Sequence, residues 1–162
     1  MRFASCAAPT HTLVTRLHKE KIERHIRAAI ETLTLGDPLT TVDMGPVANE
    51  AQRVTVQQYI RRGVEEGSRL IAGGPGYPNG LEQGWFVRPT AFTDVSNQMA
   101  IAREEIFGPV MSVICYDTIE EAIEIANDSP YGLAAYVDGN DPREVQRVAL
   151  RLRTGQVMLN GA

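Results

Sequence analysis

The amino-acid sequence predicts an α/β fold with an open, mostly parallel sheet and helices on both faces. Short β-branched, apolar stretches alternate along the whole chain with longer stretches whose apolar residues recur every three or four positions. No linker, repeat or low-complexity segment interrupts this order. Alternating strands and helices build parallel sheets covered by helical layers. The 162 residues, 43% of them hydrophobic, are expected to form one domain.

The first half of the chain contains two predicted strand–helix pairs. Helical spacing of apolar residues and short β-branched runs place strands at residues 12–15 and 69–72, and helices at residues 17–33 and 49–66. Gly67 is the expected stop of the second helix. The glycine-rich loop at residues 73–80 has no phosphate-loop lysine and opens no helix, so we interpret it as a surface loop.

In the second half, residues 86–92 are expected to be extended, with Pro89 preventing a central strand because proline has no N–H for a ladder. Two further helices carry capping boxes, in which Thr118 pairs with Glu121 and Asp141 pairs with Glu144. The remaining strands are expected at residues 110–116, 131–137 and 156–159.

Charge and composition exclude several classes of function. The formal charge is −4 and no basic block occurs, which argues against a nucleic-acid partner or an anionic membrane surface. The apolar runs are too short to span a bilayer. Only two cysteines occur, Cys6 and Cys115, which favours a reducing, cytoplasmic location over a disulfide framework. Neither they nor the three histidines have metal-ligand spacing, so no metal is expected.

The run EEIFGPV at residues 104–110 is the most informative part of the chain. A carboxylate just before a strand can accept hydrogen bonds from sugar hydroxyls, and an aromatic residue two positions later can cover a flat ring. Glu105 and Phe107 have this arrangement. Glu104 is better suited to a capping or ion-pair role.

Cys6 is the second candidate for chemistry. A thiolate can attack an aldehyde carbonyl, and the adduct can then give a hydride to a nicotinamide and become a thioester. The residue alone is also compatible with an ordinary buried thiol.

Both regions are similar to parts of the aldehyde dehydrogenase superfamily. Residues 104–110 resemble its cofactor-contacting segment, and CAAPTHTLV at residues 6–14 resembles the stretch around its nucleophile. Further similar stretches lie at residues 45–47, 66–67, 84–90, 127–135 and 156–160.

The resemblance implies NAD(P)-dependent oxidation of a small-molecule aldehyde to a carboxylic acid through a cysteine thioester. It gives Cys6 the role of nucleophile. It implies that Glu105 accepts hydrogen bonds from the nicotinamide ribose and that Phe107 lies against the ribose or the nicotinamide. The cofactor is NAD or NADP, because the contacts that distinguish them belong to a part of the family fold that this sequence does not match.

The resemblance also implies that residues 1–162 are one truncated catalytic domain, without the nucleotide-binding half and the carboxyl-terminal segment. The chain alone is then expected to be inactive, because the base that activates water is among the missing parts. A truncated sheet is expected to expose apolar residues such as Val157 and Leu159, so a homo-oligomer is expected.

Two other functions stay open from the sequence. Met1, Phe3 and Ala4 stand where the family has Asn, Gly and Gln, which favours a non-catalytic interaction or structural domain that has kept the fold. A redox sensor built from Cys6 and Cys115 would need the two thiols close in space.

Overall fold

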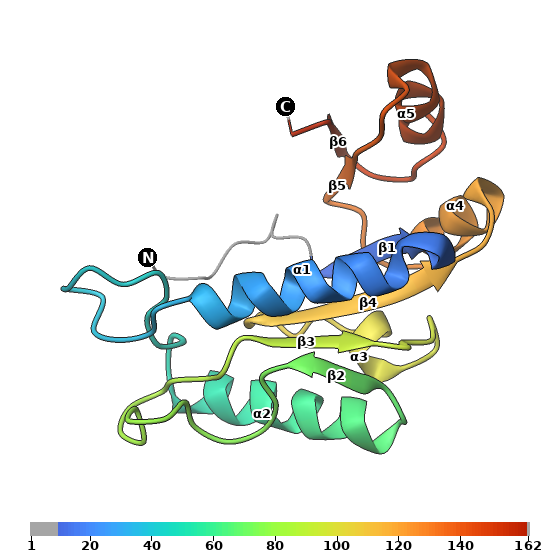
Figure 1. Cartoon of the computed structure of the whole chain (residues 1–162). Coiled ribbons are helices and arrows are strands. Elements are labelled where there is room, and N and C mark those ends of the chain that lie inside the picture. The colour runs from blue at the N-terminus through green and yellow to red at the C-terminus, as the bar shows by residue number, and fades with distance from the viewer. Residues whose placement is uncertain (1–9, 162) are drawn as a thin grey trace.

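The computed structural model describes residues 10–161 and contains a four-stranded sheet at its centre (Figure 1). Its strands are β1 (His11–Thr15), β2 (Arg69–Ala72), β3 (Thr90–Thr93) and β4 (Val110–Tyr116), in the order β1-β4-β3-β2. Strand β4 runs parallel to β1 and β3, whereas β2 is antiparallel at the edge. The prediction of a mostly parallel α/β sheet is confirmed.

Helices cover both faces of this sheet. A 3-10 turn, η1 (Arg16–His18), leads into α1 (Lys19–Thr32) on one face. Helices α2 (Glu50–Glu65) and α3 (Ala100–Arg103) lie on the other (Figure 1). Side chains of a strand alternate between faces. In β4, Val113 accordingly packs with the α1 layer, while Val110 and Ile114 pack with α2 and α3.

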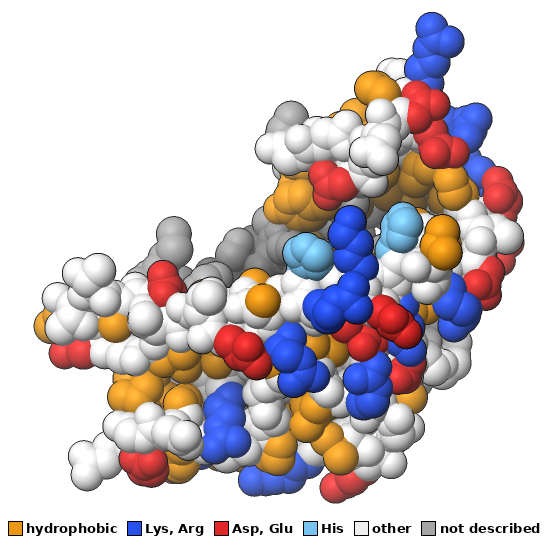
Figure 2. Space-filling model, in the orientation of Figure 1, with side chains coloured by type: hydrophobic (Ala, Val, Ile, Leu, Met, Phe, Trp, Pro, Cys, Tyr) orange, Lys and Arg blue, Asp and Glu red, His pale blue; other side chains and the backbone are white. Residues whose placement is uncertain are grey.

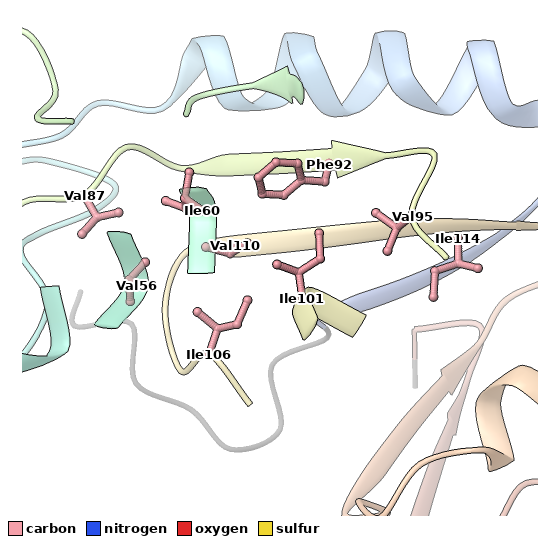
Figure 3. Packing of buried hydrophobic residues seen from close by; sticks show 9 residues of the cluster. All are labelled: Val56, Ile60, Val87, Phe92, Val95, Ile101, Ile106, Val110 and Ile114. Carbon is pink, nitrogen blue, oxygen red and sulfur yellow. The ribbon is translucent and has the colours of Figure 1, made fainter. Parts of the chain in front are cut away.

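The larger core lies between the sheet and α2, as Figure 3 shows. Phe92 from β3, Ile60 and Val56 from α2, and Ile101 from α3 are at most 1% exposed. Gly63 lets α2 approach this closely, since a Cβ at this position would lie 3.0 Å from Ile101 Cδ1. Burial of these side chains fixes α2 against the sheet.

A cluster of four charged residues joins α1 to the start of β2 and the end of β3. Arg69 bonds both Glu23, at 2.7 Å, and Asp94, at 3.2 Å, and Lys19 pairs with Asp94. The hydrogen bond from Lys19 is the main cause of the lowered pKa of Asp94. Burial raises the pKa of Glu23, but hydrogen bonds from Arg69 and Thr93 outweigh it and the pKa is lowered overall.

The last third of the described chain forms a separate βαβ unit. Helix α4 (Ile119–Asn127) is followed by β5 (Ala134–Val137), α5 (Pro142–Ala149) and β6 (Gln156–Leu159). Strands β5 and β6 pair in parallel in a two-stranded sheet of their own, apart from the main sheet (Figure 1). Val157 and Leu159, expected to be exposed, are half-buried in this unit.

Three local expectations need correction. Strand β3 is central although Pro89 was expected to prevent it, because the strand begins one residue later and Thr90 N donates to Pro109 O at 2.9 Å. Asp141 caps α5 by accepting from Arg143 N, but Glu144 pairs with Arg147 instead of completing the box. Strand β5 begins at Ala134, later than expected, and the short α3 was not expected.

Candidate functional site

Residues 104–109 connect α3 to β4 and form a turn on the α2 side of the sheet. Ile106 is 5% exposed and belongs to the larger core, so it ties the middle of the turn to the protein interior. The next residue, Phe107, has a positive φ of 54°. This left-handed conformation is uncommon outside glycine, and such residues cluster at functional sites.

One stripe of α2 contacts this whole segment. Gln52, Val56 and Tyr59 follow an i, i+4, i+7 spacing, which places them on the same side of a helix. Gln52 Nε2 donates to the carbonyl oxygens of Ile106 and Phe107, both at 2.9 Å.

Val56 limits the space beside the next residue. A Cβ at Gly108 would lie only 2.5 Å from Val56 Cγ2, so only glycine permits this approach of the turn to α2. The stripe therefore determines both the position and the shape of the turn.

Glu104 is held by a structural network, as its predicted ion-pair role implies. Tyr59 donates its hydroxyl to Glu104 Oε2 at 2.7 Å, and Arg62 bonds Glu104 Oε1 at 3.3 Å. The bond to Glu104, together with burial, raises the pKa of the Tyr59 hydroxyl. Arg62 also pairs with Glu66, whose second oxygen accepts from Ala100 N at the start of α3. The Glu104 carboxylate is thus occupied by α2.

Glu105 and Phe107 differ from Glu104 in being presented outward. The backbone N–H of Glu105 donates to the hydroxyl of Tyr131 at 3.3 Å, which fixes the backbone. The Glu105 carboxylate makes no hydrogen bond or ion pair with any other residue in the range 10–161, and it is exposed. The Phe107 ring is 41% exposed. An outward carboxylate and aromatic ring on a rigid turn can bind a hydroxylated, ring-bearing molecule.

A shallow hollow of about 340 Å³ lies along α2. It is lined by Thr55, Gln58, Tyr59 and Arg62, and the last two side chains are those that bond Glu104. A second hollow, of about 450 Å³, lies between the end of α1 and the loop after β2 and is lined by residues such as Glu31, Asn79 and Arg88. Neither hollow is lined by Glu105 or Phe107.

The predicted nucleophile, Cys6, lies outside the described residues, and its proximity to Glu105 and Phe107 stays a prediction. Cys115 lies on β4, toward the α1 side, and is a free, half-buried thiol. Burial raises its pKa, against the opposing effect of Lys19 and Arg16. A raised pKa keeps a thiol protonated and unreactive, so Cys115 has the character of a structural cysteine.

Within residues 10–161, no group of three or more His, Cys, Asp or Glu side chains could hold a metal ion. His25 Nδ1 donates a hydrogen bond to Lys21 O within α1, and His18 is exposed. Figure 2 shows Lys and Arg side chains interleaved with Asp and Glu over the face that carries α1. None of the described helices combines the length and apolar character needed to cross a membrane.

Comparison with known proteins identifies the family. The model of the aldehyde dehydrogenase family matches residues 4–162, and the chain belongs to this family. A curated relative from Staphylococcus aureus strain MSSA476, whose name marks it provisionally as an aldehyde dehydrogenase, is 46% identical over 158 residues. That match covers 97% of this chain and 33% of the relative, so the chain spans about a third of the length of its curated relatives.

Solved aldehyde dehydrogenases share the fold. One is aldehyde dehydrogenase C from Pseudomonas syringae, a C291A mutant in complex with NAD+ and octanal. It superposes with a TM-score of 0.95 at 48% identity, and the match covers 97% of this chain and 33% of the Pseudomonas syringae chain. The Mycobacterium tuberculosis enzyme in complex with NAD+ gives a TM-score of 0.94 at 42% identity, with coverage of 98% and 33%.

Sequence reasoning missed the part that α2 plays in the site. Gln52 is 54 residues from Ile106, and Tyr59 is 45 residues from Glu104. No local pattern links residues so far apart in the chain. The available signal was the half-polar stripe of α2, in which Gln52 and Tyr59 share a face with the apolar Val56 and Ile60.

Proposed function

We propose that this chain is the thiol-bearing part of an enzyme that oxidises an aldehyde to a carboxylic acid with NAD+. Residues 1–162 would form one portion of the catalytic domain. The observation that carries the proposal is the turn at residues 104–108, which presents Glu105 and Phe107 outward on a strained backbone held by α2. Family membership over residues 4–162 and the NAD+ complexes of the structural relatives support it.

In this proposal the Glu105 carboxylate accepts hydrogen bonds from the hydroxyls of the nicotinamide ribose. The carboxylate fits this role because it is exposed and has no described partner to displace. The Phe107 ring, about two-fifths exposed, covers one side of the ribose or nicotinamide and excludes water from it. Bound NAD+ supplies the hydride acceptor.

The proposed reaction at Cys6 has three steps. The Cys6 thiolate adds to the aldehyde carbonyl to form a thiohemiacetal. In the alkoxide form of this adduct the C–H bond breaks and the hydride leaves, so that a thioester remains; bound NAD+ would supply the acceptor of that hydride. Water hydrolyses the thioester to the carboxylic acid and the Cys6 thiol, and loss of a proton from the thiol restores the thiolate.

The location and assembly are also proposed. The free thiol of Cys115 favours the cytoplasm, where thiols stay reduced. A homo-oligomer is supported by the two-stranded sheet of β5 and β6, since short sheets with open edges bind further strands.

Calorimetric titration with NAD+ tests the cofactor role. Glu105→Gln removes the charge while keeping the shape, and hydrogen bonds to a charged group contribute about 1.5–3 kcal/mol, so binding should weaken about tenfold or more. Glu65→Gln is the matched control, because Glu65 is an exposed carboxylate at the end of α2 and does not belong to the turn that carries Glu105. Equal affinities for Glu105→Gln and wild type would contradict the proposal.

A steady-state assay of NADH formation tests the expectation for the chain alone. Since it spans a third of its relatives, we expect the 162-residue chain to show no turnover of simple aldehydes. Turnover that Cys6→Ala abolishes would refute this expectation.

A further inference from the structure

The side-chain amide of Gln52 donates hydrogen bonds to two successive backbone carbonyl groups. Its Nε2 lies 2.9 Å from Ile106 O and 2.9 Å from Phe107 O. In an extended chain, successive carbonyls point in opposite directions, so one amide group cannot reach both. Both can be reached only when the residue between the carbonyls, here Phe107, leaves the extended conformation. Its φ of 54° shows that it does.

Phe107 has no intrinsic reason to adopt this conformation. Glycine has no Cβ to clash, and Asn or Asp can bond their own backbone, but a phenylalanine side chain does neither. The positive φ must therefore be stabilised by the surroundings. Ile106 is buried before it and Gly108 packs on Val56 after it, and Gln52 supplies the polar contacts between these two points.

Gln52 is itself well fixed. It lies in the first turn of α2, where its backbone N–H donates to the capping Asn49 side chain at 2.8 Å. The cap and the buried Val56 one turn later hold this end of the helix in place. The amide therefore occupies a defined position before any ligand binds.

We propose that Gln52 is a positioning residue that holds Phe107 at positive φ, and thereby directs the Glu105 carboxylate and the Phe107 ring toward one side of the turn. The consequence for the nicotinamide ribose rests on the proposed function. The conformational part does not, because it concerns only the chain's own backbone.

Two variants remove the amide donor. Gln52→Met keeps the length of the side chain, and Gln52→Glu replaces the donor with an acceptor that the helix N-terminus favours electrostatically. Gln58→Met is the matched control, an identical change at an exposed position of the same helix. Thermal melting verifies that each variant is folded.

The first measurement needs no ligand. A residue with positive φ gives a strong intraresidue NOE between its amide proton and Hα. We expect this NOE at Phe107 in the wild type and in Gln58→Met, and its loss in both Gln52 variants. A strong NOE in folded Gln52→Met or Gln52→Glu would overturn the assignment of Gln52.

The second measurement follows amide shifts as nicotinamide mononucleotide is added. Loss of the Gln52 bonds should weaken binding about tenfold, while Gln58→Met binds as the wild type does. Unchanged affinity in the Gln52 variants would refute the positioning of the ligand contacts. If the wild type itself fails to bind while the NOE behaves as expected, the proposed function is wrong and the conformational role of Gln52 stands.

Discussion

Replacing Gly108 with alanine should destabilise the protein by forcing the turn away from α2. The new Cβ would lie 2.5 Å from Val56 Cγ2 and 3.1 Å from Cγ1, whereas carbon atoms in contact are about 3.5–4.0 Å apart. Val56 cannot give way, because it is fully buried and a β-branched residue in a helix has one strongly preferred rotamer. The turn must move by roughly 1 Å.

That movement has two costs. Overpacking in a core costs about 1–3 kcal/mol. A displacement of this size also lengthens the 2.9 Å bonds from Gln52 beyond hydrogen-bonding range, and each contributes about 0.5–1.5 kcal/mol. We expect Gly108→Ala to lower the free energy of unfolding by about 3 kcal/mol. Because a domain of this size loses about 2–4 °C per kcal/mol, the Tm should fall by about 6–12 °C.

A double-mutant cycle with Val56→Ala isolates the clash. Val56→Ala alone should cost about 2 kcal/mol, since two buried methyl groups are lost and a cavity is left. In that background, Gly108→Ala places its methyl group in the vacated space and should cost little. Urea unfolding monitored by circular dichroism gives all four free energies. Additive costs, within about 0.5 kcal/mol, would refute the proposed contact.

Three further predictions concern stability. Asn49→Ala removes the cap of α2 and should cost about 1 kcal/mol in urea unfolding, with no change if the cap is unimportant. Tyr59→Phe removes a partly exposed bond to Glu104 and should cost about 1 kcal/mol; a neutral effect in thermal melting would contradict it. The pKa values of Glu23 and Asp94 are lowered in the folded state, so both carboxylates stabilise the fold when they are ionised. This stabilisation is complete above their ordinary pKa values of 4.5 and 3.8, and it is lost as the pH falls through these values and below. The free energy of unfolding, measured as the pH is lowered, should show this loss, and Glu23→Gln should weaken its dependence on pH.

The sequence was informative wherever structure depends on neighbours in the chain. The β-branched run from Val110 to Tyr116 predicts β4 with its observed bounds. Thr118 caps α4 as predicted, by accepting a bond from Glu121 N. Residues 104–110 could be singled out because an acid, an aromatic and Gly-Pro stand together before a strand.

The remaining features depend on contacts between distant parts of the chain. Strand β3 is central because β2 and β4 pair with it on either side, and Pro89 does not interfere because it precedes the ladder. The separate pairing of β5 and β6 likewise has no local signal, since each strand is only four residues long and its sequence does not specify which strand it pairs with. The positive φ of Phe107 accompanies contacts with the distant Gln52 and the packing of Gly108 on Val56, which local propensity cannot reveal.

Amide-resolved NMR of the chain titrated with nicotinamide mononucleotide would locate the residues that contact the nicotinamide ribose. If the turn before β4 receives the nicotinamide ribose, the largest shift changes should fall at Glu105, Phe107 and Gly108, and adenosine monophosphate should not reproduce them. Absence of changes there, or changes centred on the glycine-rich loop at residues 73–80, would contradict the assigned role of Glu105 and Phe107.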